Sequence, residues 1–192
     1  MRGHAIVEIA IREISTYCSF ADTAYKGIDR SGRQSAESTY FFVHSLLAHC
    51  ATVSRLLWSP ELAEYAGGRP LAQLIGVPSG YHLDEDTVRE ILDRYDHRLA
   101  RGLAAKGEVA KVLDFNIGDR DAFEEELSIF LRHYDPTVDT LTIMEEEINL
   151  YGIFTELADI KTRADAWLEA NASLVERPAS LSVPPRLYKP GS

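Results

Sequence analysis

Residues 6–25 read IVEIAIREISTYCSFADTAY, and the spacing of their apolar side chains decides the fold class. These side chains recur at steps of three and four residues, which places them along one face of a helix. The predicted apolar stripe consists of Ile6, Ile9, Ala10, Ile14, Tyr17, Cys18 and Ala21. Further helices are predicted over residues 36–58, 84–105 and 150–170. Four amphipathic helices in sequence most simply form an antiparallel four-helix bundle, so the predicted class is mainly α.

Turn-forming residues separate the predicted helices. The second helix is expected to end before Ser59-Pro60, because proline disfavours helical geometry in the residue that precedes it. Residues 59–81 are rich in glycine and proline, and we expect a long connection with short helical turns at 62–65 and 71–75. Acidic residues at 84–86 suit the positive end of the third helix.

A small β insertion is predicted between the third and fourth helices, at about residues 108–146. Apolar and polar residues alternate around Phe130 and again around Leu141, and Asp135-Pro136 supplies turn chemistry between the two runs. Such a pattern is typical of a β-hairpin. Helix stays an alternative for residues 122–131. The predicted organisation is one domain, residues 1–171, followed by a proline-rich extended or disordered tail, residues 172–192.

The charge of the chain is concentrated in one region. The sequence has 192 residues, 45% of them apolar, and a net charge of -10, which disfavours a general nucleic-acid-binding surface. Residues 108–149 contain twelve acidic and three basic residues, so nearly all of the net charge lies there. A solvated face is the simplest interpretation, with a cation site or a docking surface for a basic partner as alternatives. Binding of nucleic acid therefore stays open.

Compartment and membrane association follow from a few residues. Cys18 and Cys50 lie on predicted apolar helix faces without CxxC spacing, so we expect buried free thiols and no zinc site. Residues 1–10 do not form a signal peptide, and we expect a cytoplasmic protein. Residues 40–58 are largely apolar, but His44, His49 and Arg55 favour a buried bundle helix over a membrane span.

The predicted third helix carries the densest group of polar side chains in the sequence. Residues three and four apart share one face of a helix, so several of these arginines become neighbours. The group is either a salt-bridged solvated face or a site where arginines meet an anion. Its members are Arg89, Glu90, Asp93, Arg94, Asp96, His97, Arg98 and Arg101. The sequence contains no Walker A, GxGxxG or GxSxG motif, and we expect no cofactor and no metal.

The same helix carries a resemblance to a known superfamily. The run Arg89-Glu90-x-x-Asp93-Arg94-Tyr95-Asp96-x-Arg98-Leu99 resembles Arg-Asn-x-x-Glu-His-Phe-Asp-Glu-Arg-Leu of a group of uncharacterised bacterial helical proteins. Ser45-Leu46-Leu47-x-His49, Ser54-Arg55-x-Leu57-Trp58 and the run from Arg132 to Pro136 are similar to them too. The Arg-x4-6-His core of that motif in turn resembles the HEPN superfamily of helical bundles. Many HEPN members are metal-independent ribonucleases of toxin and phage-defence systems, and others only bind.

The sequence departs from this motif at the position that carries the chemistry. Arg94 stands where the superfamily has histidine, and a guanidinium stays protonated and cannot act as a base. The resemblance therefore implies a non-catalytic HEPN-like protein that acts through binding, as a homodimer or with a protein partner. The alternatives are a metal-independent ribonuclease and a small-ligand sensor with a pocket between the second and third helices, lined by His49, Arg55 and Arg89. Candidate binding residues are Arg89, Arg94, Asp96, His97, Arg98, His49 and Arg55.

Overall fold

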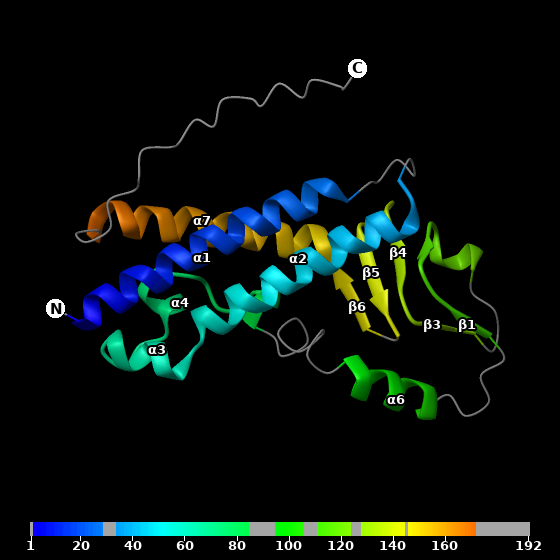
Figure 1. The fold of residues 1–192 in the computed structure, drawn as a ribbon, viewed down its shortest axis with the longest axis horizontal. Coiled ribbons are helices and arrows are strands. Elements are labelled where there is room, and N and C mark those ends of the chain that lie inside the picture. The colour runs from blue at the N-terminus through cyan, green and yellow to red at the C-terminus, as the bar shows by residue number, and fades with distance from the viewer. Residues whose placement is uncertain are drawn as a thin grey trace, which may run out of the picture.

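The computed structural model describes residues 2–28, 34–84, 95–105, 111–123, 128–144 and 146–171. The described chain is mainly helical with a small sheet (Figure 1). Its long helices are α1 (Arg2–Gly27), α2 (Ala36–Leu57) and α7 (Leu150–Asn171). The shorter helical elements are α3 (Pro60–Tyr65), α4 (Leu71–Leu74), the 3-10 turn η1 (His82–Asp84), α6 (Tyr95–Ala105) and the 3-10 turn η2 (Arg120–Ala122).

The main core lies where α1 packs between α2 and α7 (Figure 1). Buried residues of α1 and of the turn that follows it alternate by four and three positions, which is the heptad spacing of helices that pack at a shallow angle. The members of this series are Val7, Ile11, Ile14, Cys18, Ala21, Tyr25 and Ile28, and Glu8, Ala10, Ser15 and Ala24 are buried beside it. The buried residues of α7 follow nearly the same steps, from Leu150 to Leu168. Ile9 was predicted to belong to this stripe but is 52% exposed, because the four-three steps select Val7 and Ile11.

The ends of α2 and α3 follow from local capping. Ser35 precedes α2, and its hydroxyl oxygen accepts a hydrogen bond from the backbone N–H of Ser38 at 3.3 Å. Ser59 caps α3 in the same way through Leu62, and Pro60 occupies the first turn, where its missing N–H costs nothing. The predicted break at Ser59-Pro60 and the helical turns near 62–65 and 71–75 are confirmed.

The connection from α3 to η1 is attached to α7 by polar contacts. Gly76 adopts a φ of 75°, in the left-handed region that favours glycine, and its carbonyl accepts a hydrogen bond from Arg163 Nη1 at 2.6 Å. The Tyr81 hydroxyl donates to Asp159 Oδ2 at 2.7 Å. These contacts hold the connection against the side of α7.

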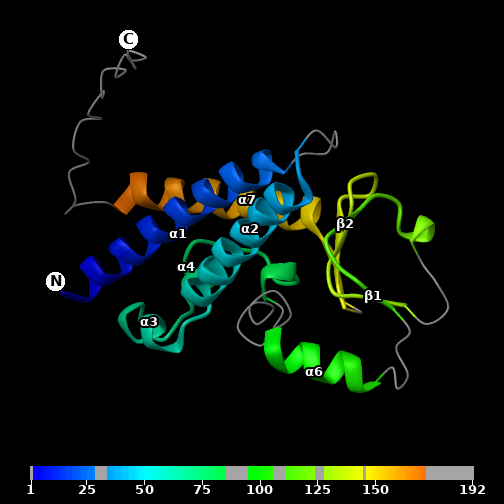
Figure 2. The same cartoon turned by 45° about the vertical axis from the view of Figure 1, so that its right-hand side comes forward.

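The β structure lies at the end of the helices where α1 ends and where α2 and α7 begin (Figures 1 and 2). Four strands form a sheet in the order β2-β4-β5-β6, and β1 pairs in parallel with β3. β4 and β5 form the predicted hairpin, with Tyr134 opposite Leu141. The strands are β1 (Lys111–Leu113), β2 (Asn116–Ile117), β3 (Ser128–Phe130), β4 (His133–Asp135), β5 (Thr140–Ile143) and β6 (Glu146–Asn149).

Two tyrosines connect the sheet to the helices. The carboxylate of Asp139, in the turn between β4 and β5, accepts hydrogen bonds from Tyr25 of α1 at 2.5 Å and from Tyr134 of β4 at 2.6 Å. The Tyr40 hydroxyl of α2 donates to the carbonyl of Asn116 at 2.7 Å. The sheet is therefore fixed to both α1 and α2.

The predicted four-helix bundle is not confirmed. Within the described ranges, α1, α2 and α7 pack together, whereas α6 lies away from α1 and α7 (Figures 1 and 2). Leu99 of α6 is half-buried against the core. Residues 85–94, in the first part of the predicted third helix, and the predicted tail at 172–192 lie outside the described residues.

Candidate functional site

One side of the α1–α2 hairpin presents apolar side chains to solvent. We call this surface the outer face and define it by Ile9 and Phe20 of α1 and by Phe41, Ala48 and His49 of α2. Ile9 is 52% exposed, Phe20 is 50% exposed and Phe41 is 68% exposed. Ile9 and Phe20 are separated by three helical turns and therefore lie on the same side of α1. The outer face therefore runs along two neighbouring helices, with the exposed Glu13 and Thr16 between its two α1 side chains.

His49 is the predicted site residue that lies on this face. Its ring contacts the ring of Tyr17, with centroids 5.8 Å apart, and that of Phe20, with centroids 5.5 Å apart. Ser45 Oγ lies 3.5 Å from His49 Nε2. Burial lowers the pKa of His49, so the imidazole is neutral at pH 7. His49 therefore serves this surface as a half-buried aromatic group.

The α2 part of the outer face is free of formal charge. Between Glu37 and Arg55 the helix contains no Asp, Glu, Lys or Arg. The two histidines in this stretch, His44 and His49, both have a lowered pKa, chiefly because of burial. An exposed helix surface without charge has a low desolvation cost when another apolar surface covers it.

The other predicted site residues do not gather around His49. Arg55 lies six positions after His49 and about 120° from it around α2, on the same side of the helix as Ala48, and it is exposed at the end of the outer face. It lines a shallow cavity of about 310 Å³ with Trp58 and Glu61 at the junction of α2 and α3. The predicted pocket also included Arg89, which lies outside the described residues.

The arginine-rich flank of the predicted third helix is described only in part. His97 is exposed on α6, and Asp96 and Arg98 belong to the same helix. Arg94, like Arg89, lies outside the described residues. An anion site on this flank therefore stays a prediction.

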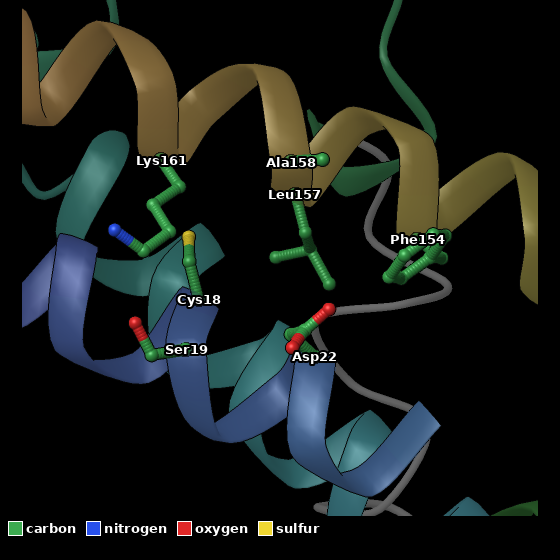
Figure 3. Close-up of a pocket in the computed structure, with 7 residues that line it drawn as sticks. All are labelled: Cys18, Ser19, Asp22, Phe154, Leu157, Ala158 and Lys161. Carbon is green, nitrogen blue, oxygen red and sulfur yellow. The ribbon is translucent and has the colours of Figure 1, made fainter. Parts of the chain in front are cut away.

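A cavity of about 270 Å³ lies between α1 and α7 and was not predicted from the sequence (Figure 3). From α1 it is lined by Cys18, Ser19 and Asp22, and from α7 by Phe154, Leu157, Ala158 and Lys161. Figure 3 shows Lys161 toward one end and Phe154 toward the other, with Leu157 of α7 opposite Asp22 of α1 between them. Small side chains on both helices leave the space open. The sequence shows that these residues are small, but not that they lie opposite each other.

The cavity wall contains one neutral thiol and two ion pairs. Burial raises the pKa of Cys18 to about 12, so the thiol is protonated and unreactive near neutral pH. Lys161 Nζ donates to Asp165 at 2.5 Å, and Ser15 donates to the same carboxylate at 2.6 Å. On the α1 side Asp22 accepts from Lys26 at 2.7 Å, in a pair exposed to solvent.

A polar cluster joins α2 to the sheet. Arg132 donates to both carboxylate oxygens of Asp114, at 2.7 and 2.5 Å, and its guanidinium lies 3.9 Å from the centre of the Phe115 ring. Phe115 has a φ of 55°, a strained conformation for an aromatic residue. Burial and the Arg132 charge lower the pKa of His44, which lies nearby. These contacts stabilise the junction and leave Arg132 committed to Asp114.

A buried histidine lies in the sheet. His133 is 1% exposed and contacts the rings of Phe123 and Phe130. Neither ring nitrogen has a hydrogen-bond partner among the described residues. Burial lowers the pKa of His133, against the opposing effect of the Asp135 charge. The ring is therefore held neutral among aromatic neighbours.

Three general features complete the description. Cys18 and Cys50 are buried free thiols, as predicted. The described residues contain no group of three or more His, Cys, Asp or Glu side chains arranged to hold a metal ion. In the same part of the chain, no helix combines the length and the apolar character needed to cross a membrane.

Comparison with known proteins adds no assignment. No family model, no curated protein and no solved structure matches this chain.

Proposed function

We propose that this chain is a non-catalytic binding protein that acts as a homodimer, with the outer face of α1 and α2 as its dimer surface. The observation that carries the proposal is the exposure of Ile9, Phe20 and Phe41 beside the charge-free stretch of α2. Aromatic side chains with few charges are typical of the buried centre of an interface.

A second copy of the chain is the partner that fits this surface best. α1 is already covered by α7 on its inner side, so the α1–α2 hairpin has one apolar side left. Two hairpins that pack face to face around a twofold axis bring four helices together, which is a common and stable helical arrangement. A twofold interface places each residue against the same surface of the second copy. The α2 part of this surface has no charge between Glu37 and Arg55, and on α1 the exposed Glu13 lies between Ile9 and Phe20.

The proposal also agrees with the HEPN-like resemblance, because some members of that superfamily only bind. In this scheme the arginine-rich flank from Arg89 to Arg101 is a second surface, available for an anionic or protein partner. Dimer formation through the outer face leaves α6 free for that role.

Mass measurement of the purified chain tests the dimer. Size-exclusion chromatography with light scattering is expected to give twice the chain mass of 21.5 kDa at micromolar concentration. Phe41→Asp introduces a charge at the most exposed aromatic side chain of the outer face without disturbing the core, because Phe41 is 68% exposed. This variant is expected to be monomeric and to keep its helical circular dichroism spectrum.

Tyr151→Asp provides a matched control. Tyr151 is a 59% exposed aromatic residue near the start of α7, outside the outer face. We expect this variant to remain dimeric. A wild-type chain that is monomeric at high micromolar concentration, or a Tyr151 variant that dissociates as Phe41→Asp does, would overturn the proposal.

A further inference from the structure

We propose that the cavity between α1 and α7 is a binding site for a small organic amine with an apolar body. The site uses residues that the proposed dimer does not, because Cys18 and Asp22 point toward α7 whereas Phe20 points to solvent on the outer face. It is therefore independent of the proposed function. Three features of the cavity indicate this ligand: its size, its apolar wall and the unequal exposure of the lysines in its two ion pairs.

The size of the cavity limits the ligand to a small molecule. A cavity of about 150 Å³ holds a benzene ring, so the 270 Å³ measured here has room for about ten non-hydrogen atoms. This volume is just below the range of about 300–1,000 Å³ for ligand pockets, so only a small ligand fits. A single aromatic ring with a short side chain fits it.

The wall on the α7 side suits an aromatic or aliphatic body. Leu157 projects into the centre of the space, and Phe154 forms one end (Figure 3). The Phe154 ring stacks on Tyr25 with centroids 4.1 Å apart and planes 11° apart, which holds it in place. The neutral thiol of Cys18 adds a polarizable apolar contact on the opposite side.

The ion pairs decide the charge of the ligand. Lys161 is held by Asp165, and Ser15 anchors that carboxylate in turn, so an anionic ligand must compete with a half-buried network. Among the described residues, Asp22 is bound through a pair with Lys26, whose side chain is 67% exposed, whereas that of Lys161 is 36% exposed. The two carboxylates are similarly exposed, so the difference lies in the lysines and in the second hydrogen bond that Ser15 gives Asp165. Exposed ion pairs of this kind contribute little, so a ligand cation can replace Lys26 at small cost.

The position of Asp22 completes the recognition. Its carboxylate lies opposite Leu157, between Lys161 and Phe154 (Figure 3). A ligand ammonium group paired with Asp22 therefore places its apolar body along Phe154 and Leu157. The protonated amine and the ring are recognised by different residues, and variants can separate the two contributions.

A titration with three matched probes tests the site. The probes are 2-phenylethylamine, 2-phenylethanol and 3-phenylpropionate, which are cationic, neutral and anionic versions of nearly the same frame. Binding is measured by protein-observed NMR on the full chain. We expect the amine to bind most tightly and the anion most weakly, with shift changes at residues 18–22 and 154–161. An anion that binds as tightly as the amine, or shift changes elsewhere, would overturn the proposal.

Variants assign the interactions to single residues. Asp22→Asn is expected to weaken the amine about fivefold and to leave the alcohol unchanged, because only the charged probe uses the carboxylate. Lys26→Ala removes the internal competitor, and we expect it to tighten the amine about twofold. An unchanged amine affinity in both variants contradicts the assignment of Asp22.

A filling substitution tests the location. Ala158 is exposed at the edge of the cavity, so Ala158→Leu reduces the space without overpacking the core. This variant is expected to lose binding of both the amine and the alcohol. Ala170→Leu, an exposed alanine near the end of α7, is the control and should bind as the wild type does. Equal binding by both variants excludes the cavity as the site.

Discussion

The contact that connects the sheet to the helices should account for a measurable part of the stability. Asp139 lies in the turn between β4 and β5 and accepts hydrogen bonds from Tyr25 and Tyr134, both of which are buried. Asp139 also has a φ of 52°, and its carbonyl accepts from the backbone N–H of Leu150 at 2.9 Å. One residue therefore joins α1, the hairpin and the start of α7.

The magnitude follows from the two hydrogen bonds. A hydrogen bond to a charged group contributes about 1.5–3 kcal/mol. Asn tolerates the left-handed region and keeps one acceptor oxygen, so Asp139→Asn is expected to cost about 2 kcal/mol. Asp139→Ala removes both acceptors and adds about 1 kcal/mol of backbone strain, for a total of about 4 kcal/mol. For a chain of this length, 2 kcal/mol corresponds to a decrease in Tm of about 6 °C.

Urea denaturation followed by far-UV circular dichroism measures these differences. Tyr25→Phe and Tyr134→Phe remove one hydrogen bond each, and in the double variant Asp139→Asn should cost much less than it does in the wild type. Asp22→Asn is the control, because its pair with Lys26 is exposed, and it should change the free energy of unfolding by less than about 0.5 kcal/mol. If Asp139→Asn also changes the free energy of unfolding by less than about 0.5 kcal/mol, as the control does, Asp139 does not stabilise the junction as described.

Three further predictions concern the sheet, the connection and catalysis. Burial lowers the pKa of His133 in the folded state, so the unfolded state binds the proton more readily. The free energy of unfolding is therefore expected to fall as the pH drops below about 6.5, by at most about 1.4 kcal/mol per pH unit for this proton. His133→Leu should flatten a plot of Tm against pH. Ser54 donates to the buried carbonyl of Leu83 at 2.6 Å, so Ser54→Ala is expected to cost about 1–2 kcal/mol in urea denaturation, and an unchanged midpoint contradicts this. The purified chain is expected to leave RNA intact on a denaturing gel without added metal; cleavage that disappears in Arg89→Ala would favour the ribonuclease alternative instead.

The helices could be predicted because their signals are local. Ser59-Pro60 marks a helix end and a helix start within two residues, and the structure follows it. The choice of buried residues was less accurate, since Ile9 fits a three-four pattern but lies on the exposed side of α1. Which apolar side of a helix becomes buried depends on where its neighbours pack, and this information is not local.

The sheet and the cavity show the same limit. The hairpin of β4 and β5 follows from the turn at Asp135-Pro136, but the parallel pairing of β2 with β4 and of β1 with β3 joins segments that are not adjacent in sequence. The cavity requires Ser19 and Ala158 to lie close together across two helices far apart in the chain. The outer face can be recognised in the sequence. A helix with one solvated side usually carries charged residues on that side, and α2 has none between Glu37 and Arg55.

The position of α1 between α2 and α7 has a consequence for synthesis on the ribosome. α2 follows α1 directly, so the hairpin of these two helices can form early. α1 ends at Gly27, whereas α7 begins at Leu150, so the side of α1 that packs on α7 stays uncovered until nearly all of the described chain has left the exit tunnel. During that interval the nascent chain exposes Ile11, Ile14 and Cys18 beside the outer face, and this is the period when chaperones have most apolar surface to bind.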